Sequence, residues 1–158
     1  GLQTSCIVVP NAILRHKVNR AINTDEVAEP NSFAITASIT AFEKGGKWLE
    51  ELKSYIESNK QMAHAYIKTY LPELHVTPSE ATYLLWIDCS HVCKNSLELV
   101  EFIRSTTGLY LSSGEEYGKN AKSFIRMNIA CPQERLNDGL KRLRQGIGNY
   151  KKGSENYE

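Results

Sequence analysis

Apolar residues recur with the 3.6-residue period of an α-helix over an unusually long stretch, from Lys47 to Tyr70. A helix of this length spans roughly 36 Å, which is enough to cross a whole domain and link two layers. Pro72 ends it, because proline cannot continue a helix. The apolar positions are Trp48, Leu52, Tyr55, Ile56, Ala63, Tyr66, Ile67 and Tyr70.

The residues before the long helix predict one strand and two helices. Cys6–Val9 is a short apolar run with the composition of a buried strand. Apolar residues at helical spacing then predict helices over residues 11–23 and 32–44, and Gly45–Gly46 stops the second one.

The second half of the chain changes character and predicts an α+β layer. In chain order we expect a strand over 82–88, a helix over 95–108, strands over 109–111 and 124–130, and a final helix that starts at Pro132. This order is typical of a small three-stranded sheet with helices packed on one face. Residues 151–158 form a polar tail.

Composition excludes several classes of protein. The chain has 158 residues, of which 41% are hydrophobic, so it can bury a real core. The formal net charge of +1 provides no global field for binding nucleic acid or a membrane surface. The apolar runs are too short to span a bilayer. We expect the four scattered cysteines to be free thiols in a reducing cytoplasm.

The strand over Phe124–Ile129 contains the most informative residue of the chain. Alternation places Ile125, Met127 and Ile129 on the core face and Arg126 on the opposite face. A charged residue within an apolar strand must find an anion or reach water. Arg126 is therefore a candidate receptor for a carboxylate or phosphate, whose geometry its planar fork matches. The alternative is a structural ion pair with a nearby acidic residue, or a side chain that reaches solvent at a sheet edge.

Two other clusters are weaker candidates. The loop over residues 112–118 contains two glycines, which permit a close backbone approach to a ligand, and Tyr117, which could project into a cleft. Cys89, His91 and Cys93 resemble part of a zinc site, but a structural site needs a further ligand, and none is evident at a suitable spacing. We therefore predict no metal site.

Three segments, in this order, resemble fold-type I pyridoxal-phosphate (PLP) enzymes of the class I/II aminotransferase superfamily. Gly1–Ser5 and the apolar run after it are similar to the stretch that follows the lysine that holds PLP. Glu80–Asp88 looks like a strand of the family's small domain, and Ser113–Pro132 is similar to its substrate-carboxylate segment. The branch that the chain resembles most is that of the cystathionine β-lyase-like C–S lyases. The resemblance extends to about Tyr150.

The resemblance implies that this chain is the C-terminal portion of such an enzyme. Residues 1–46 would be a remnant of the large PLP-binding domain, 47–150 the small domain with the long linking helix, and 151–158 the polar tail. Arg126 is implied to bind the α-carboxylate of an amino-acid substrate, and Gly1 and Gln3 to lie near the phosphate of the cofactor. The lysine of the family lies upstream of the matching segment. No catalytic residue is therefore expected in this chain, and the chain alone is expected to be inactive.

The resemblance also implies that the partners of this chain are the missing N-terminal half and a second subunit of a homodimer. Without that half, the apolar side chains of the first two helices are expected to face water. Lyase and aminotransferase activity both remain open, because the residues that choose between them are mostly upstream. A function of another class also remains open, namely a free-standing α+β module that binds a small carboxylate through Arg126, or a protein partner. The side chains expected to face water are Leu14, Val18, Ile35, Ile39 and Phe42.

Overall fold

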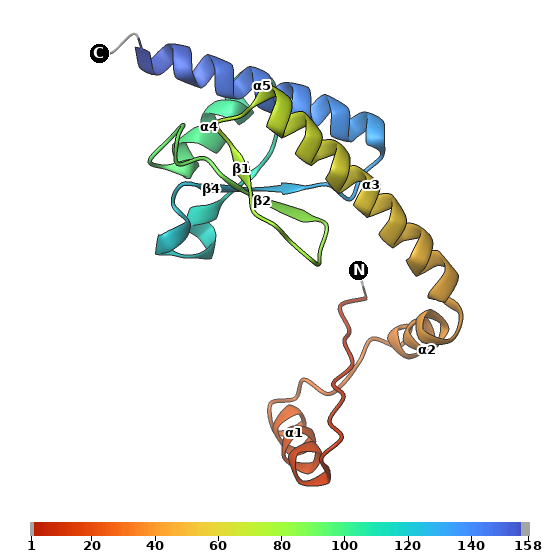
Figure 1. Ribbon diagram of the computed structural model, residues 1–158. Helices are drawn as coiled ribbons and strands as arrows, with labels where there is room; N and C mark the ends of the chain where they lie inside the picture. Colours follow the sequence, from red (N-terminus) through yellow and green to blue (C-terminus); the bar gives the residue numbers. More distant parts are fainter. Residues whose placement is uncertain (1, 156–158) are drawn as a thin grey trace. The chain divides into compact units, whose positions relative to one another are not determined.

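The structure is a computed structural model that describes residues 2–155 (Figure 1). The chain divides into two compact units, one up to Glu51 and one from Leu52 onward. Within the described part, no helix is both long enough and apolar enough to cross a membrane.

The N-terminal unit contains two helices, α1 over Ala12–Thr24 and α2 over Ala34–Lys44. Asn11 caps α1, because its side-chain oxygen accepts hydrogen bonds from the amides of Ile13 and Leu14, both at 3.0 Å. The strand expected over Cys6–Val9 is not formed, and most of this segment is exposed. The described part of this unit contains no other strand, so the backbone groups of the segment have no ladder to join.

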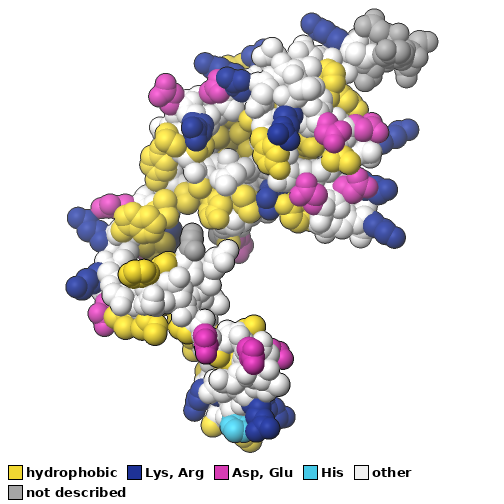
Figure 2. Space-filling model, turned by 180° about the vertical axis from the view of Figure 1, so that it is seen from behind, with side chains coloured by type: hydrophobic (Ala, Val, Ile, Leu, Met, Phe, Trp, Pro, Cys, Tyr) yellow, Lys and Arg dark blue, Asp and Glu magenta, His cyan; other side chains and the backbone are white. Residues whose placement is uncertain are grey.

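The apolar side chains of these two helices are largely exposed, as expected. Leu14, Ile35, Ile39 and Phe42 are among the exposed large hydrophobic residues, and Phe42 retains 81% of its accessible surface. Val18 is half-buried. Figure 2 shows hydrophobic side chains on the surface of these helices. Such a surface has the character of one that another part of a protein covers.

The C-terminal unit is an α+β layer, and the expected fold class is confirmed. Its elements are α3 (Gly46–Tyr70, which begins before the unit boundary), β1 (His75–Val76), β2 (Leu84–Asp88), α4 (Ser96–Thr107), β3 (Ser112–Ser113), the short 3-10 helices η1 (Gly114–Tyr117) and η2 (Lys119–Ala121), β4 (Phe124–Asn128) and α5 (Gln133–Glu155). The strands form one antiparallel sheet in the order β1-β2-β4-β3.

Three details differ from the expectation. The sheet has four strands rather than three, because β1 pairs with the end of β2 through only two residues, too few to produce a periodic signal. The short strand expected over 109–111 forms at Ser112–Ser113 instead, where the chain meets β4. Helix α5 continues through Glu155, so residues 151–155 of the expected tail are helical.

The core lies on one face of the sheet, which α3, α4 and α5 cover (Figure 1). Its largest fully buried side chains come from these helices and from alternate positions of β2 and β4. They are Ile67, Leu85, Ile87, Leu99, Ile103, Ile125, Ile129, Leu136, Leu140, Leu143 and Ile147. The other face of β2 and β4 is only partly buried, and we call it the open face.

Helix α3 is also tied to the turn between β4 and α5. The hydroxyl oxygen of Tyr55 accepts a hydrogen bond of 3.0 Å from the backbone amide of Gln133, and the side-chain amide of Gln133 lies 3.1 Å from the hydroxyl of Ser58. These bonds fix the point at which the chain leaves the sheet.

Candidate functional site

Arg126 lies in the middle of β4, an inner strand of the sheet. Its direct neighbours across the sheet are Trp86 on β2 and Ser112 on β3. Because side chains alternate along a strand, Arg126 is on the open face while Ile125 and Met127 are in the core. The position that the alternation predicted for Arg126 is therefore the one that the structure has.

Among the described residues, the guanidinium of Arg126 makes one hydrogen bond and one cation–π contact, and neither neutralises its charge. Nη2 donates a hydrogen bond of 3.1 Å to Oγ of Ser112. The central carbon Cζ lies 4.8 Å from the centre of the Tyr117 ring, which is a cation–π geometry. Among the described residues, no carboxylate pairs with Arg126. Most of its N–H donors thus remain available to an anion.

Aromatic side chains continue from Tyr117 along the open face. The ring of Trp86 meets that of Tyr117 edge to face at 5.7 Å, and it stacks on Phe124 at 5.5 Å with an interplanar angle of 12°. These rings form one apolar border beside the guanidinium. An apolar border lowers the local dielectric constant, so a charge–charge contact with Arg126 is stronger than it would be in water.

The loop between β3 and β4 is held firmly, unlike a plain connection. The hydroxyls of Ser96 and Ser113 share a buried hydrogen bond of 2.8 Å, which ties the loop to the first turn of α4. Gly114 allows the loop to fold tightly, since a Cβ there would lie 2.7 Å from the carbonyl oxygen of Phe124 and would collide with that of Ala121. These contacts set the place of Tyr117.

The sequence indicated Arg126 and Tyr117 as candidates, but it did not identify Ser112 and Trp86 as the neighbours of Arg126 across the sheet. The sequence did contain a signal for Trp86. Alternation along β2 places its side chain on the face opposite to that of the buried Leu85 and Ile87. No sequence signal exists for Ser112, since its pairing with Arg126 depends on the register between two strands.

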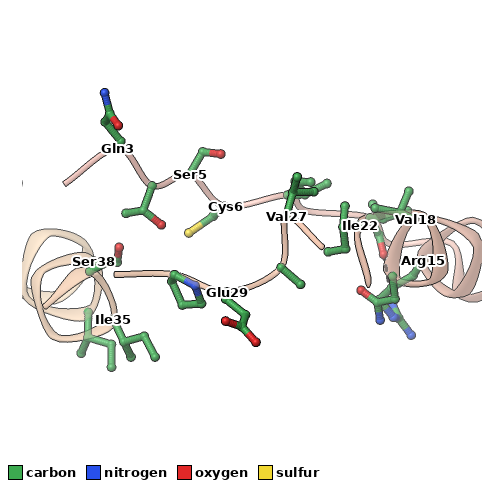
Figure 3. Close-up of a pocket in the computed structure, with 18 residues that line it drawn as sticks. Gln3, Ser5, Cys6, Arg15, Val18, Ile22, Val27, Glu29, Ile35 and Ser38 are labelled. Atoms are coloured by element: carbon green, nitrogen blue, oxygen red, sulfur yellow. Dashed lines mark hydrogen bonds between the residues drawn. The ribbon is translucent and has the colours of Figure 1, made fainter. Parts of the chain in front are cut away.

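The other predicted site residues lie in the N-terminal unit. Gly1 lies outside the described residues. Gln3 has a left-handed backbone conformation, with φ of 49°, and lines a hollow of about 680 Å³ together with Thr4 and Ser5 (Figure 3). Arg15 also lines this hollow, and its Nη1 donates to the carbonyl oxygen of Val9 at 3.0 Å. None of the described residues that line the hollow is a lysine.

The cysteines considered for zinc lie in the core. Cys89 and Cys93 are both buried free thiols. Burial raises the pKa of the Cys93 thiol to about 11 and that of Cys89 further. A metal ligand must be a thiolate, so this environment disfavours metal binding. In the described part of the chain, no three His, Cys, Asp or Glu side chains are grouped as a metal site would require.

Comparison with known proteins supports the resemblance seen in the sequence. No protein-family model matches the chain. Cystathionine β-lyase PatB of Bacillus subtilis is 35% identical over 147 residues, which are 93% of this chain and 38% of PatB. The crystal structure named "PLP-bound putative aminotransferase from Clostridium difficile 630" matches with a TM-score of 0.81 and 30% identity, over 89% of this chain and 36% of that one.

A PLP-bound C–S lyase from Staphylococcus hominis matches with a TM-score of 0.76 and 26% identity, again over 89% of this chain and 36% of that one. The chain thus spans little more than a third of the length of the proteins that it matches. The expected similarity to PLP-dependent aminotransferases and C–S lyases is confirmed.

Proposed function

We propose that this chain is the C-terminal part of a PLP-dependent enzyme that acts on amino acids, either as a C–S lyase or as an aminotransferase. In this proposal Arg126 binds the α-carboxylate of the substrate. The observation that carries the proposal is a half-buried arginine on an inner strand that has no carboxylate partner among the described residues. Leaving such a charge without an anion costs free energy, and a substrate carboxylate would recover it.

The position of Arg126 suits the binding of a carboxylate in one defined orientation, and not only its electrostatic attraction. Its backbone pairs with β2 on one side and β3 on the other, so the side chain starts from a fixed point. A guanidinium can give a carboxylate two parallel hydrogen bonds, which define the orientation of the substrate as well as its affinity. The aromatic border of Trp86 and Tyr117 limits the directions from which a carboxylate approaches.

The residues that line the N-terminal hollow fit only one end of PLP. The hydroxyls of Thr4 and Ser5 and the side-chain amide of Gln3 are donors of the kind that bind a phosphate. We propose that Gly1 and Gln3 lie near this phosphate. The amine that would hold the cofactor must come from elsewhere, since none of the described lining residues is a lysine. When bound, PLP supplies an electron sink for the α-carbon of the substrate.

The proposal includes the rest of the enzyme. Residues 1–46 are assigned to a large PLP-binding domain, 47–150 to a small domain and 151–158 to a tail. The missing N-terminal half and a second subunit cover the exposed apolar side chains of α1 and α2, and they contribute the residues without which the chain alone is inactive. The free thiols fit a cytoplasmic location.

The test uses the full-length protein that carries this chain. The purified protein is assayed for bound PLP by its absorbance and is then given cystathionine. Release of pyruvate assigns a lyase, and exchange of an amino group with a keto acid assigns an aminotransferase. Absence of bound PLP and of both products would overturn the proposal.

The second candidate is a free-standing module that binds a small carboxylate, and the accessible Arg126 of this chain favours it. Titration of the 158-residue chain with acetate and alanine, followed by NMR, separates the two candidates. Saturable binding at Arg126 with a Kd below about 1 mM, which corresponds to a binding free energy of roughly 4 kcal/mol or more, supports the module. Binding only in the full-length protein supports the enzyme.

A further inference from the structure

We propose that Tyr117 and Ser112 are positioning residues that hold the fork of Arg126 in the orientation that receives the substrate carboxylate. This inference rests on the proposed function of Arg126. Neither residue needs to touch the reacting atoms, because each acts through the guanidinium that it contacts.

The two contacts restrain different motions of the side chain. Ser112 lies directly opposite Arg126 on β3, and its hydroxyl accepts the hydrogen bond from Nη2 at 3.1 Å. This bond fixes the rotation of the fork within its own plane. The Tyr117 ring, 4.8 Å from Cζ, packs against the guanidinium and limits its tilt. Together they select one orientation from the many that a long arginine side chain samples in solution.

Tyr117 can restrain the guanidinium because other residues hold the Tyr117 ring in place. Its ring meets Trp86 edge to face at 5.7 Å. Its 3-10 helix begins with Gly114, where no side chain fits, and follows Ser113, which is held by the buried bond to Ser96. The ring thus belongs to a restrained loop although 50% of its surface is exposed.

An acidic side chain of the same loop has an ion-pair partner other than Arg126. Glu115 lies two residues before Tyr117, and its carboxylate is 3.7 Å from Nζ of Lys122. The contact that this loop makes with the guanidinium is the Tyr117 ring. Among the described residues, no carboxylate of this loop pairs with Arg126.

A prepositioned fork binds a carboxylate more tightly, because less side-chain freedom is lost on binding. Removing the ring should therefore raise KM for amino-acid substrates, by about three- to tenfold for a contact of this type. Removing the Ser112 hydroxyl should raise KM by a similar factor of about three to ten. The chemical step should change less, since the charge of Arg126 is retained.

The first experiment needs neither cofactor nor activity. In the 158-residue chain, the side-chain protons of Arg126 should show an upfield ring-current shift by NMR. Tyr117→Leu should reduce this shift to the part that the neighbouring Trp86 ring causes, and Tyr117→Phe should keep it because the ring remains. Tyr70→Leu is the matched control. Tyr70 is 47% exposed, and the centre of its ring lies 4.6 Å from Cζ of Arg144. Its loss removes a similar cation–π pair but should leave the chemical shifts of Arg126 unchanged.

The second experiment measures KM and kcat of the full-length protein in a double-mutant cycle. Tyr117→Leu and Ser112→Ala should each raise KM in the presence of Arg126. In an Arg126→Ala background the same changes should alter kcat/KM by less than about twofold, because the group through which they act is gone. Tyr117→Phe keeps the ring, so its KM should stay close to that of the parent protein.

The outcomes separate failure of this inference from failure of the proposed function. If Arg126→Ala has no effect on amino-acid substrates, the proposed function fails. If Arg126→Ala is severe but Tyr117→Leu and Ser112→Ala are neutral, or act fully in its absence, the positioning role is wrong. A Tyr117→Leu protein with a smaller ring-current shift at Arg126 and a raised KM supports the positioning role.

Discussion

The side-chain amide of Asn59 on α3 donates a hydrogen bond of 2.8 Å to the carbonyl oxygen of Ile129, 70 residues further along the chain. The same nitrogen donates to the carbonyl oxygen of Cys131 at 2.9 Å. Asn59 is fully buried, and its Oδ1 has no hydrogen-bond partner among the described residues. Helix α3 thus fixes the chain just after the strand that carries Arg126.

Replacing Asn59→Leu should destabilise the chain. The two carbonyl groups lose their shared donor inside the core, and leaving a buried polar group unpaired costs about 1–3 kcal/mol. We expect a loss of about 2 kcal/mol in the free energy of unfolding, measured by urea denaturation. Asn149→Leu, on the exposed side of α5, is the control and should change stability by less than about 0.5 kcal/mol. An unchanged midpoint for Asn59→Leu would contradict the role of this amide.

Asn59→Asp should make stability depend on pH. An ionised carboxylate at this buried place would face two carbonyl oxygens without a donor, so its pKa in the folded state should rise above the unfolded value of about 3.9. A raised pKa gives stability that is present below the unfolded value and is lost as the pH rises through the folded value. The variant should therefore be closest to the parent chain near pH 4 and weakest near pH 8. If the free energy of unfolding of the variant is below that of the parent chain by the same amount at pH 4 and pH 8, the predicted rise in pKa is wrong.

Arg126 should be essential in the full-length protein. Arg126→Ala should lower kcat/KM for amino-acid substrates by about two to three orders of magnitude, as expected for truncating one partner of a buried charge pair. Arg126→Lys should also weaken the protein strongly, because an ammonium lacks the bidentate fork. Steady-state kinetics checks both, while amines without a carboxylate should react as before. Loss of folding, with a normal KM in what remains, would instead identify a purely structural role for Arg126.

Cys93 should link stability to alkaline pH. Burial raises the pKa of its thiol in the folded chain to about 11, while a thiol in the unfolded chain has a pKa of about 8.5. Since the unfolded state releases its proton first, the stability that Cys93 contributes is complete below about pH 8.5 and falls as the pH rises toward 11. Urea denaturation from pH 8 to 10 should show this decline, and Cys93→Ala should make it shallower. A slope that does not respond to the substitution would exclude this thiol as its source.

The exposed apolar side chains of α2 should cause self-association of the isolated chain. Ile35 and Phe42 retain 57% and 81% of their accessible surface, and such surfaces tend to find partners. Sedimentation should show a molecular weight that rises with concentration, and Ile35→Lys with Phe42→Lys should lower it. Lys47→Glu is a surface control outside this patch. A monomer at high concentration would show that the apolar side chains do not drive association.

The parts of the fold with strong periodicity could be predicted from the sequence. The 3.6-residue repeat located α3 within one residue, and the alternation around Arg126 gave its face. The strand expected over Cys6–Val9 was wrong, because an apolar run forms a strand only where another strand supplies hydrogen bonds. The two-residue strand β1 was missed for lack of a pattern.

The candidate site shows the same limit. Arg126 could be predicted because the sequence alone shows a charged residue in the middle of an apolar strand. Its partners could not, since Ser112 reaches it through strand register and Tyr117 through a loop whose path depends on Gly114 and the buried Ser96–Ser113 bond. Long-range pairing of this kind has no local signal in the chain.

The bonds between α3 and the β4–α5 turn also constrain the order in which the chain folds. Tyr55 and Asn59 meet partners 78 and 70 residues away, so each contact closes a long loop and costs more chain entropy than the local turns of α4 or α5. These contacts should therefore form after the folding transition state, with φ-values near zero. Weakening them would speed unfolding and leave the folding rate almost unchanged, so these two hydrogen bonds would prolong the lifetime of the folded layer without helping it to form.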